Sequence, residues 1–201
     1  MNEIPRIRIA EILLDNSPTL WKNLEEFLKF ILPIAEDAGV KLAIHPDDPP
    51  IDEVMGTARI MNNVEAFERL INEFPSEYNG ITFDNSLFSL MTDELVAVVK
   101  HFLGKKRIFF VRFREVIGKR NNFTEVFIGE GITKQFEEMR EYVKHGFYGP
   151  FRVDHTPTLM GDTVSVPGYS ALGRIYAIGY LQGLFRAAVE SLFDKQRIQK
   201  F

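Results

Sequence analysis

The chain has 201 residues, is 45% hydrophobic and 26% charged, and carries a formal net charge of −4. A mildly acidic chain lacks the excess of Lys and Arg that neutralises phosphates, so we expect no nucleic-acid partner. It contains no cysteine, which excludes disulfides, thiolate zinc sites and cysteine nucleophiles. The length favours one domain, 1–201, with a real core that we expect its 18 phenylalanines to fill.

The predicted elements alternate between helix and strand. Apolar residues recur at spacings of three and four over 19–38, which predicts a helix, with Ser17 and Pro18 as start signals and Gly39 as its stop. The elements predicted after it are, in order, a strand at 41–44, a helix at 64–74, a strand at 81–83, a helix at 92–102 with Thr92 as a possible N-cap, a strand at 107–113, a polar connection at 118–131, a helix at about 133–145, a fourth strand ending at 154–155, and a final helix at roughly 169–193 with a possible break near its glycines.

Strands separated by helices of this length imply parallel pairing through right-handed crossovers, so the predicted fold class is α/β. The N-terminal segment RIRIAEILL could add one short strand. No segment approaches the ~20 consecutive apolar residues of a membrane span. No signal peptide is recognisable, and we therefore expect a cytoplasmic protein without a membrane partner.

Each of the four predicted strands ends in side chains that can ligate, donate or titrate. These are His45 with Asp47 and Asp48, Asp84 with Asn85, Arg112 with Arg114, and Asp154 with His155. Taken singly, each has a simpler explanation as a turn former, a helix cap or a loop residue. Because the carboxyl ends of parallel strands lie on one side of a sheet, their coincidence predicts a ligand-binding rim.

Three strings resemble one known family. GVKLAIHPDDPP (39–50), RVDHTP (152–157) and PGYSALGR (167–174) are similar, in order and spacing, to the C-terminal half of mannonate dehydratase. The resemblance implies a barrel of the TIM type like that of xylose isomerase. It also implies a divalent metal, Mn²⁺ or another cation such as Fe²⁺, and loss of water from D-mannonate to give 2-keto-3-deoxy-D-gluconate.

Position by position, the resemblance assigns metal binding to His45 and Asp154. It assigns proton transfer to His155 and Tyr169. Asp84 stands where the family has a metal-binding cysteine, and a carboxylate can still hold a hard cation. These residue types suit the reaction, because proton removal beside a carboxylate creates enolate-like charge and the departing hydroxyl needs a general acid.

Arg112 is the largest departure, because the family has a metal-binding histidine there. A guanidinium stays protonated and has no free lone pair, so it cannot ligate. It could turn outward or hold the substrate carboxylate. We expect Arg112, Arg114, Asp47 and Arg174 to be the substrate-binding residues. Pro157 replaces a further histidine of the family pattern.

Length is the other departure, since a complete barrel of this type usually needs about 250 residues. Four strand–helix units predict a partial or half barrel whose exposed edges another copy or a partner chain completes, or else a remnant. Three functions therefore stay open. They are a metal-dependent hydro-lyase, an impaired or altered relative that binds a sugar acid, and one half of an assembly.

Overall fold

A computed structural model describes residues 17–198 of the chain, with side chains described through residue 193. Its centre is a sheet in the order β1 (Leu42–Ile44), β4 (Asn79–Asp84), β5 (Ile108–Phe113) and β8 (Phe151–Val153). Every neighbouring pair in this sheet is parallel, which confirms the predicted α/β class. The predicted N-terminal strand in RIRIAEILL lies outside the described residues.

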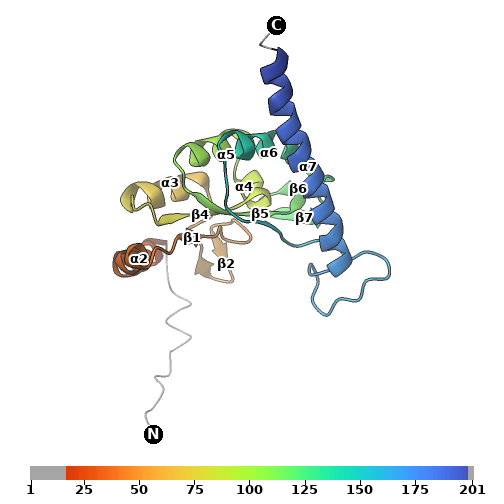
Figure 1. Ribbon diagram of the computed structural model, residues 1–201. Helices are drawn as coiled ribbons and strands as arrows, with labels where there is room; N and C mark the ends of the chain where they lie inside the picture. Colours follow the sequence, from red (N-terminus) through yellow and green to blue (C-terminus); the bar gives the residue numbers. More distant parts are fainter. Residues whose placement is uncertain (1–16, 199–201) are drawn as a thin grey trace.

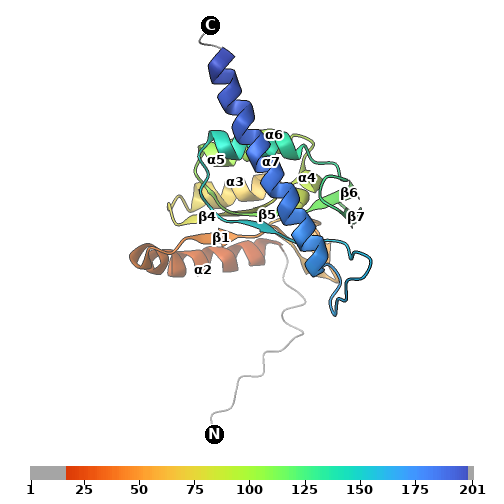
Figure 2. The same cartoon turned by 45° about the vertical axis from the view of Figure 1, so that its right-hand side comes forward.

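Helices flank this sheet unevenly. They are α2 (Ser17–Ala38), α3 (Val64–Glu73), α4 (Asn85–Met91), α5 (Leu95–Gly104), α6 (Gln135–Lys144) and α7 (Ala171–Ile198). Figure 1 shows α3, α5 and α6 above the sheet, α2 below it beside β1, and α7 running diagonally past the opposite edge. The turned view in Figure 2 shows the same separation of α2 from the upper helices.

Local signals explain where the first two of these helices begin or end. Gly39 adopts φ +68°, a left-handed conformation that glycine tolerates, and the Val40 N–H beyond it bonds to the Ala35 carbonyl at 2.8 Å. The α3 helix begins after Asn63, whose side-chain oxygen accepts from the Ala66 N–H at 2.8 Å.

The main core lies between the sheet and the upper helices, and aromatic rings dominate it. The rings of Phe83 in β4 and Phe88 in α4 stack with centroids 4.1 Å apart, and both side chains are fully buried. Phe67, Phe102 and Phe113 are also fully buried in this cluster. Because side chains alternate along a strand, burying Phe83 and Phe113 on the helical face turns Asp84 and Arg112 to the other face.

Two hairpins and one helix depart from the predicted elements. The segment 118–131, predicted as a polar connection, contains most of the hairpin formed by β6 (Glu115–Lys119) and β7 (Asn122–Val126). A smaller hairpin pairs β2 (Glu53–Val54) with β3 (Thr57–Ala58). These strands are short and mix polar and apolar residues without a sustained alternation, so no pattern predicted them.

The helix boundaries also differ in three places. The short helix α4 was not predicted, and Asp84 is its N-cap. Thr92 ends α4 rather than capping the next helix, which begins at Leu95. The last helix, α7, is continuous through its glycines from Ala171 to Ile198. Among the described residues, no helix has the length and apolarity needed to cross a membrane.

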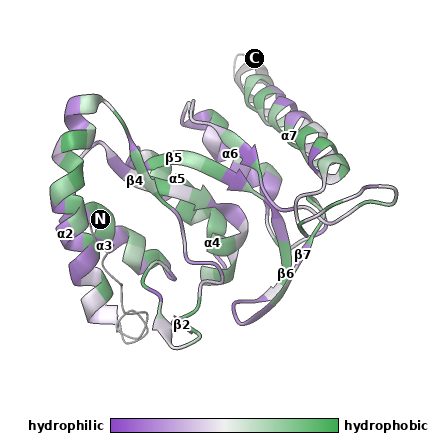
Figure 3. Ribbon diagram, turned by 90° about the horizontal axis from the view of Figure 1, so that it is seen from below, coloured by the Kyte–Doolittle hydropathy of each residue, from purple (hydrophilic) through white to green (hydrophobic). Residues whose placement is uncertain are grey.

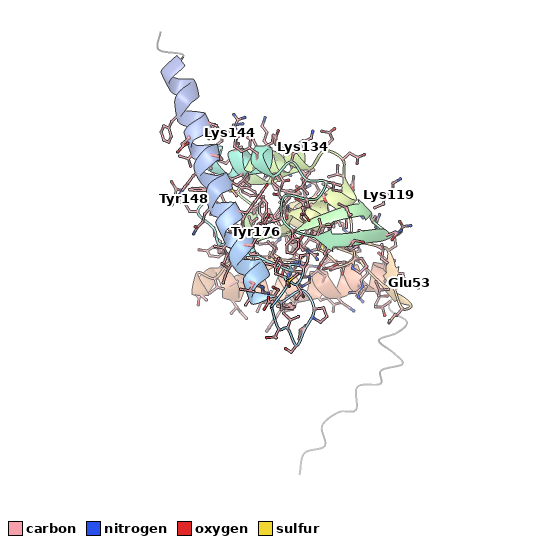
Figure 4. The ribbon with its side chains drawn as sticks, turned by 90° about the vertical axis from the view of Figure 1, so that its right-hand side faces the viewer. Glu53, Lys119, Lys134, Lys144, Tyr148 and Tyr176 are labelled. Carbon is pink, nitrogen blue, oxygen red and sulfur yellow. The ribbon has the colours of Figure 1, made fainter. Side chains whose placement is uncertain are left out.

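The lower face of the sheet and its two edges are less covered than the upper face. Figure 3, which views the molecule from below, shows no helix in front of β4 and β5 between α2 and α7. Within the described residues, β1 and β8 each have a sheet neighbour on one side only. Figure 4 shows Tyr176 on α7, whose hydroxyl donates to the Ile128 carbonyl at 3.3 Å and ties this helix to the segment after β7.

A buried carboxyl in α6 predicts how stability varies with pH. Glu138 is fully buried, and neither carboxyl oxygen has a hydrogen-bond partner among the described protein atoms. Burial first, and then the charges of Glu115 and Glu137, raise the pKa of Glu138 well above its usual value. The folded chain therefore keeps a proton here that the unfolded chain loses above about pH 4.3. Stability is consequently lost as pH rises from that value towards the folded pKa.

We expect Glu138→Gln to be more stable than the wild type at pH 7 and equal to it near pH 4. The gain should grow by about 1.4 kcal/mol for each pH unit within the window, because the neutral amide needs no proton. Urea unfolding at several pH values measures it. Glu190→Gln, at an exposed position of α7, is the matched control and should change stability little at any pH. A pH-independent difference for Glu138→Gln would contradict the assignment.

Candidate functional site

The predicted strand ends converge at one rim of the sheet. His45 follows β1, Asp84 ends β4, Arg112 and Arg114 lie at the end of β5, and Asp154 and His155 follow β8. Strand register brings them together, since the Cα of Asp84 pairs with that of Arg112 across β4 and β5. The rim expected from the sequence therefore exists as a cluster of charged and imidazole groups.

Arg112 points into this cluster rather than outward. Its Nη1 lies 2.6 Å from His45 Nε2, and its Nη2 forms an ion pair with the Asp154 carboxylate. Its Nε lies 4.0 Å from an Asp84 oxygen. The Arg112 side chain is 18% exposed, whereas those of Asp84 and Asp154 are fully buried. One guanidinium thus contacts all three residues to which the resemblance assigned a metal.

The hydrogen bonds of His45 define its tautomer. Nδ1 lies 2.7 Å from the Pro46 carbonyl oxygen, which can only accept, so Nδ1 carries the proton and donates it. Nε2 is then the nitrogen with the lone pair, and it accepts from Arg112. The lone pair that a metal ion would need is therefore already used by a guanidinium.

Asp84 caps a helix and also belongs to the cluster. Its Oδ1 accepts from the Leu87 N–H at 3.0 Å and from the Ser86 hydroxyl at 2.8 Å, which starts α4. Its Oδ2 lies 3.1 Å from Arg114 Nε and 3.6 Å from His45 Nε2. Burial acts to raise the pKa of Asp84, but the positive charge of Arg114 and the hydrogen bond from the Leu87 N–H act against it, and the pKa lies well below its usual range.

Arg114 is the buried hub of the cluster. Its side chain is 1% exposed, and Nη2 lies 2.7 Å from the Asp48 carboxylate while Nη1 pairs with Glu125. Burial acts to lower the pKa of Arg114, but the charges of Asp84, Asp48, Glu125 and Asp154 raise it above its ordinary value. The predicted substrate-binding arginine thus lies behind the rim, where it neutralises buried carboxylates.

His155 and Tyr169 lie side by side at the exposed margin of the rim. Their ring centroids are 5.2 Å apart in an edge-to-face arrangement. Gly168, just before Tyr169, adopts φ +83°, a left-handed conformation that glycine tolerates. His155 Nδ1 lies 3.0 Å from a Glu125 oxygen, so it donates to this carboxylate and leaves Nε2 with the lone pair.

The guanidinium of Arg174 stacks on the ring of Tyr169. Its guanidinium carbon lies 4.6 Å from the centre of the Tyr169 ring. Nε and Nη2, which form one edge of the guanidinium fork, are buried and have no hydrogen-bond partner among the described protein atoms. A carboxylate is the group that fits such a pair of parallel donors.

Asp47 holds its own loop, and the neighbouring Asp48 is the aspartate that contacts the cluster. An Asp47 oxygen accepts from the Met61 N–H at 2.7 Å, and the other lies 3.5 Å from Arg59 Nη1. Sequence reasoning placed Asp48 among the strand-end residues of the rim but gave it no role in the site, and it missed Glu125 entirely. The adjacent strand-end position was a signal for Asp48, but nothing in the sequence pointed to Glu125, because its hairpin was not predicted.

The side chains present do not fit a divalent metal as they are arranged. Over the part of the chain that the structure describes, no three His, Asp or Glu side chains are grouped so that they could hold a metal ion. The candidate ligands already have other partners. Arg112 contacts His45 and Asp154, whereas Asp84 contacts Arg114 and the N-terminus of α4.

A family comparison assigns most of the chain to one known group. Residues 12–195 match the sequence model of D-mannonate dehydratase (UxuA). Mannonate dehydratase of Streptococcus suis (strain 05ZYH33) is 38% identical over 171 residues, which cover 84% of this chain and 46% of the relative. Mannonate dehydratase 2 of Halalkalibacterium halodurans is 34% identical over 172 residues, covering 84% of this chain and 49% of the relative. The chain thus spans about half the length of these relatives.

Solved structures give the same answer for the fold. The crystal structure of mannonate dehydratase from Streptococcus suis serotype 2 superposes with a TM-score of 0.85 at 34% identity, covering 92% of this chain and 54% of that one. A D-tagatose 3-epimerase-like protein superposes with a TM-score of 0.58 at 16% identity, covering 94% of this chain and 61% of the other, which supports the fold alone.

Proposed function

Because the chain belongs to the mannonate dehydratase family, we propose that it supplies the acid–base part of a sugar-acid hydro-lyase site, which converts D-mannonate to 2-keto-3-deoxy-D-gluconate by loss of water. The observation that carries the proposal is the adjacency of His155 and Tyr169 beside Arg174, whose Nε and Nη2 lack partners among the described protein atoms. These groups suit the elimination, because one must take a proton, one must protonate the departing hydroxyl, and one must hold the carboxylate in place.

The geometry suggests a role for each side chain. Arg174 receives the carboxylate of the sugar acid through Nε and Nη2. His155 Nε2 takes the proton from the carbon next to this carboxylate, and Glu125 stabilises the imidazolium through Nδ1. Tyr169 gives its proton to the hydroxyl on the next carbon, whose C–O bond breaks and releases water. The resulting enol then takes up a proton at that carbon to become the 2-keto product.

A second candidate function is binding of a sugar acid without turnover. The contacts of Arg112 with His45 and Asp154 favour this second function. They occupy the two side chains to which the family resemblance assigned metal binding. The two functions share the carboxylate contact at Arg174 and differ only in whether product forms. One assay with two readouts therefore separates them.

We expect Arg174→Met to weaken binding of D-mannonate by about 10- to 100-fold, the cost of losing a charge-assisted hydrogen-bond pair. Calorimetric titration measures binding, and release of the 2-keto acid measures turnover. Arg69→Met, which removes an exposed arginine of α3 that pairs with Glu73, is the matched control and should bind as the wild type does. Product formation by the wild type supports the hydro-lyase, and binding without product supports the second candidate. If the wild type neither binds D-mannonate nor forms product, both candidate functions are wrong.

We further propose that a second copy of the chain, or a separate chain, closes the open sides of the sheet to complete a barrel. In the described residues, β1 and β8 have unpaired edges. Large apolar side chains are exposed along both flanking helices, among them Phe27 and Phe30 of α2 and Ile175 and Phe185 of α7. Light scattering of the purified chain, alone and with candidate partners, tests this, and a stable monomer in every mixture would contradict it.

A further inference from the structure

We infer that the Arg112 guanidinium is a built-in cation that takes the place of a divalent metal ion at this rim. The proposal assigns Arg112 a positioning role, which is to hold His45 and Asp154 in the arrangement that the rim requires. It goes beyond the proposed function, because it concerns the charge of the site in the free protein and holds whether or not a sugar acid is turned over.

The contacts of Arg112 are those of a central cation. Nη1 takes the lone pair of His45 at 2.6 Å, Nη2 pairs with the Asp154 carboxylate, and Nε faces Asp84 at 4.0 Å. These three partners come from the ends of three different strands. A single positive group therefore links β1, β4 and β8 through β5, as a metal ion bridging the same ends would.

The electrostatics of the cluster explain why a cation is needed there. Asp84 and Asp154 are both fully buried, and a buried carboxylate is costly unless a positive charge lies beside it. Arg114 covers one side of Asp84 at 3.1 Å but lies 3.8 Å from Asp154. The closest positive charge to Asp154 is thus Arg112. A guanidinium suits the position because it stays protonated and presents several donors in one plane.

The same contacts work against a divalent ion. To bind at His45 and Asp154, the ion would have to displace both Arg112 contacts and would then lie next to a positive guanidinium. Replacing Arg112 by an uncharged residue should free His45 and Asp154 and remove the positive charge next to the ion. Arg112→His should in addition supply a fourth potential ligand beside His45, Asp84 and Asp154, a donor set of imidazoles and carboxylates that suits Mn²⁺.

The test is titration of the chelator-treated chain with Mn²⁺, without substrate, followed by calorimetry and by the electron paramagnetic resonance signal of free Mn²⁺. We expect no stoichiometric binding to the wild type. Arg112→His should bind one Mn²⁺ at least about 100-fold more tightly, because one positive charge about 4 Å from a divalent ion is worth well over two decades in affinity at an effective dielectric constant of about 20. Arg112→Lys, which keeps the charge, should behave as the wild type.

Two controls keep the result specific. Arg186→His makes the same replacement on the exposed side of α7 and should gain no site. His45→Ala, combined with Arg112→His, should abolish the gained binding. One equivalent of Mn²⁺ bound by the wild type and lost in His45→Ala would overturn the proposal, as would a folded Arg112→His variant without gained affinity. If that variant does not fold, Arg112→Gln, which removes the charge without adding an imidazole, takes its place, and a folded Arg112→Gln variant without gained affinity would overturn the proposal. None of these titrations contains D-mannonate. Their outcome is therefore independent of whether the chain binds or dehydrates a sugar acid.

Discussion

Replacing Arg114 by methionine is expected to lower the free energy of unfolding by about 3–5 kcal/mol, the cost of leaving buried charges without their partner. Arg114 contacts more carboxylates than any other side chain of the rim does, and it is 1% exposed. Methionine replaces the apolar stem of arginine but not its guanidinium, so the loss is mainly one of charge and hydrogen bonds. The largest cost arises at Asp84, because this carboxylate is fully buried and would lose its ion pair with Arg114 Nε at 3.1 Å.

Urea unfolding, monitored by circular dichroism, measures this loss as a shift of the transition midpoint. Arg120→Met is the matched control, because Arg120 pairs with Asp52 at 2.8 Å on the surface, where Asp52 is 89% exposed. Such a surface ion pair is worth about 0–1 kcal/mol. If both variants lose equally little, Arg114 is not the hub that the contacts indicate.

His155→Gln is expected to lower turnover of D-mannonate by about 10²- to 10⁴-fold, the usual contribution of a positioned general acid or base. Glutamine can keep a hydrogen bond to Glu125, which now lies 3.0 Å from the imidazole, but it cannot accept and release a proton at neutral pH. Binding of the sugar acid should change far less than turnover, because the carboxylate contact at Arg174 is untouched.

Initial rates of 2-keto acid release, compared with binding of D-mannonate by calorimetry, separate these two effects. His101→Gln is the control, because His101 lies on α5, is 47% exposed and pairs with Glu68 away from the rim. Equal loss of binding and turnover in His155→Gln would mean that His155 shapes the pocket. Unchanged turnover would remove it from the chemistry altogether.

Local patterns in the sequence were enough to predict the strand ends, because an apolar run that meets polar residues and proline changes its backbone and its solvation at that point. Parallel pairing then placed His45, Asp84 and Asp154 on one rim. The motif strings identified the family, which the comparison confirms. The roles of His155, Tyr169 and Arg174 rest on those strings and stay predictions.

What the sequence by itself determined was the order of the four central strands and of the longer helices, and the kinds of side chain at each strand end. Only the tertiary structure decided what those side chains contact. Arg112 meets His45 from 67 positions away, and Arg114 meets Glu125 through a hairpin whose short strands gave no signal. Contacts of this kind depend on strand register and on the balance of buried charges, which are properties of the whole folded chain. For that reason the direction of Arg112, which decides whether the rim can hold a metal, could not be predicted from its neighbours in sequence.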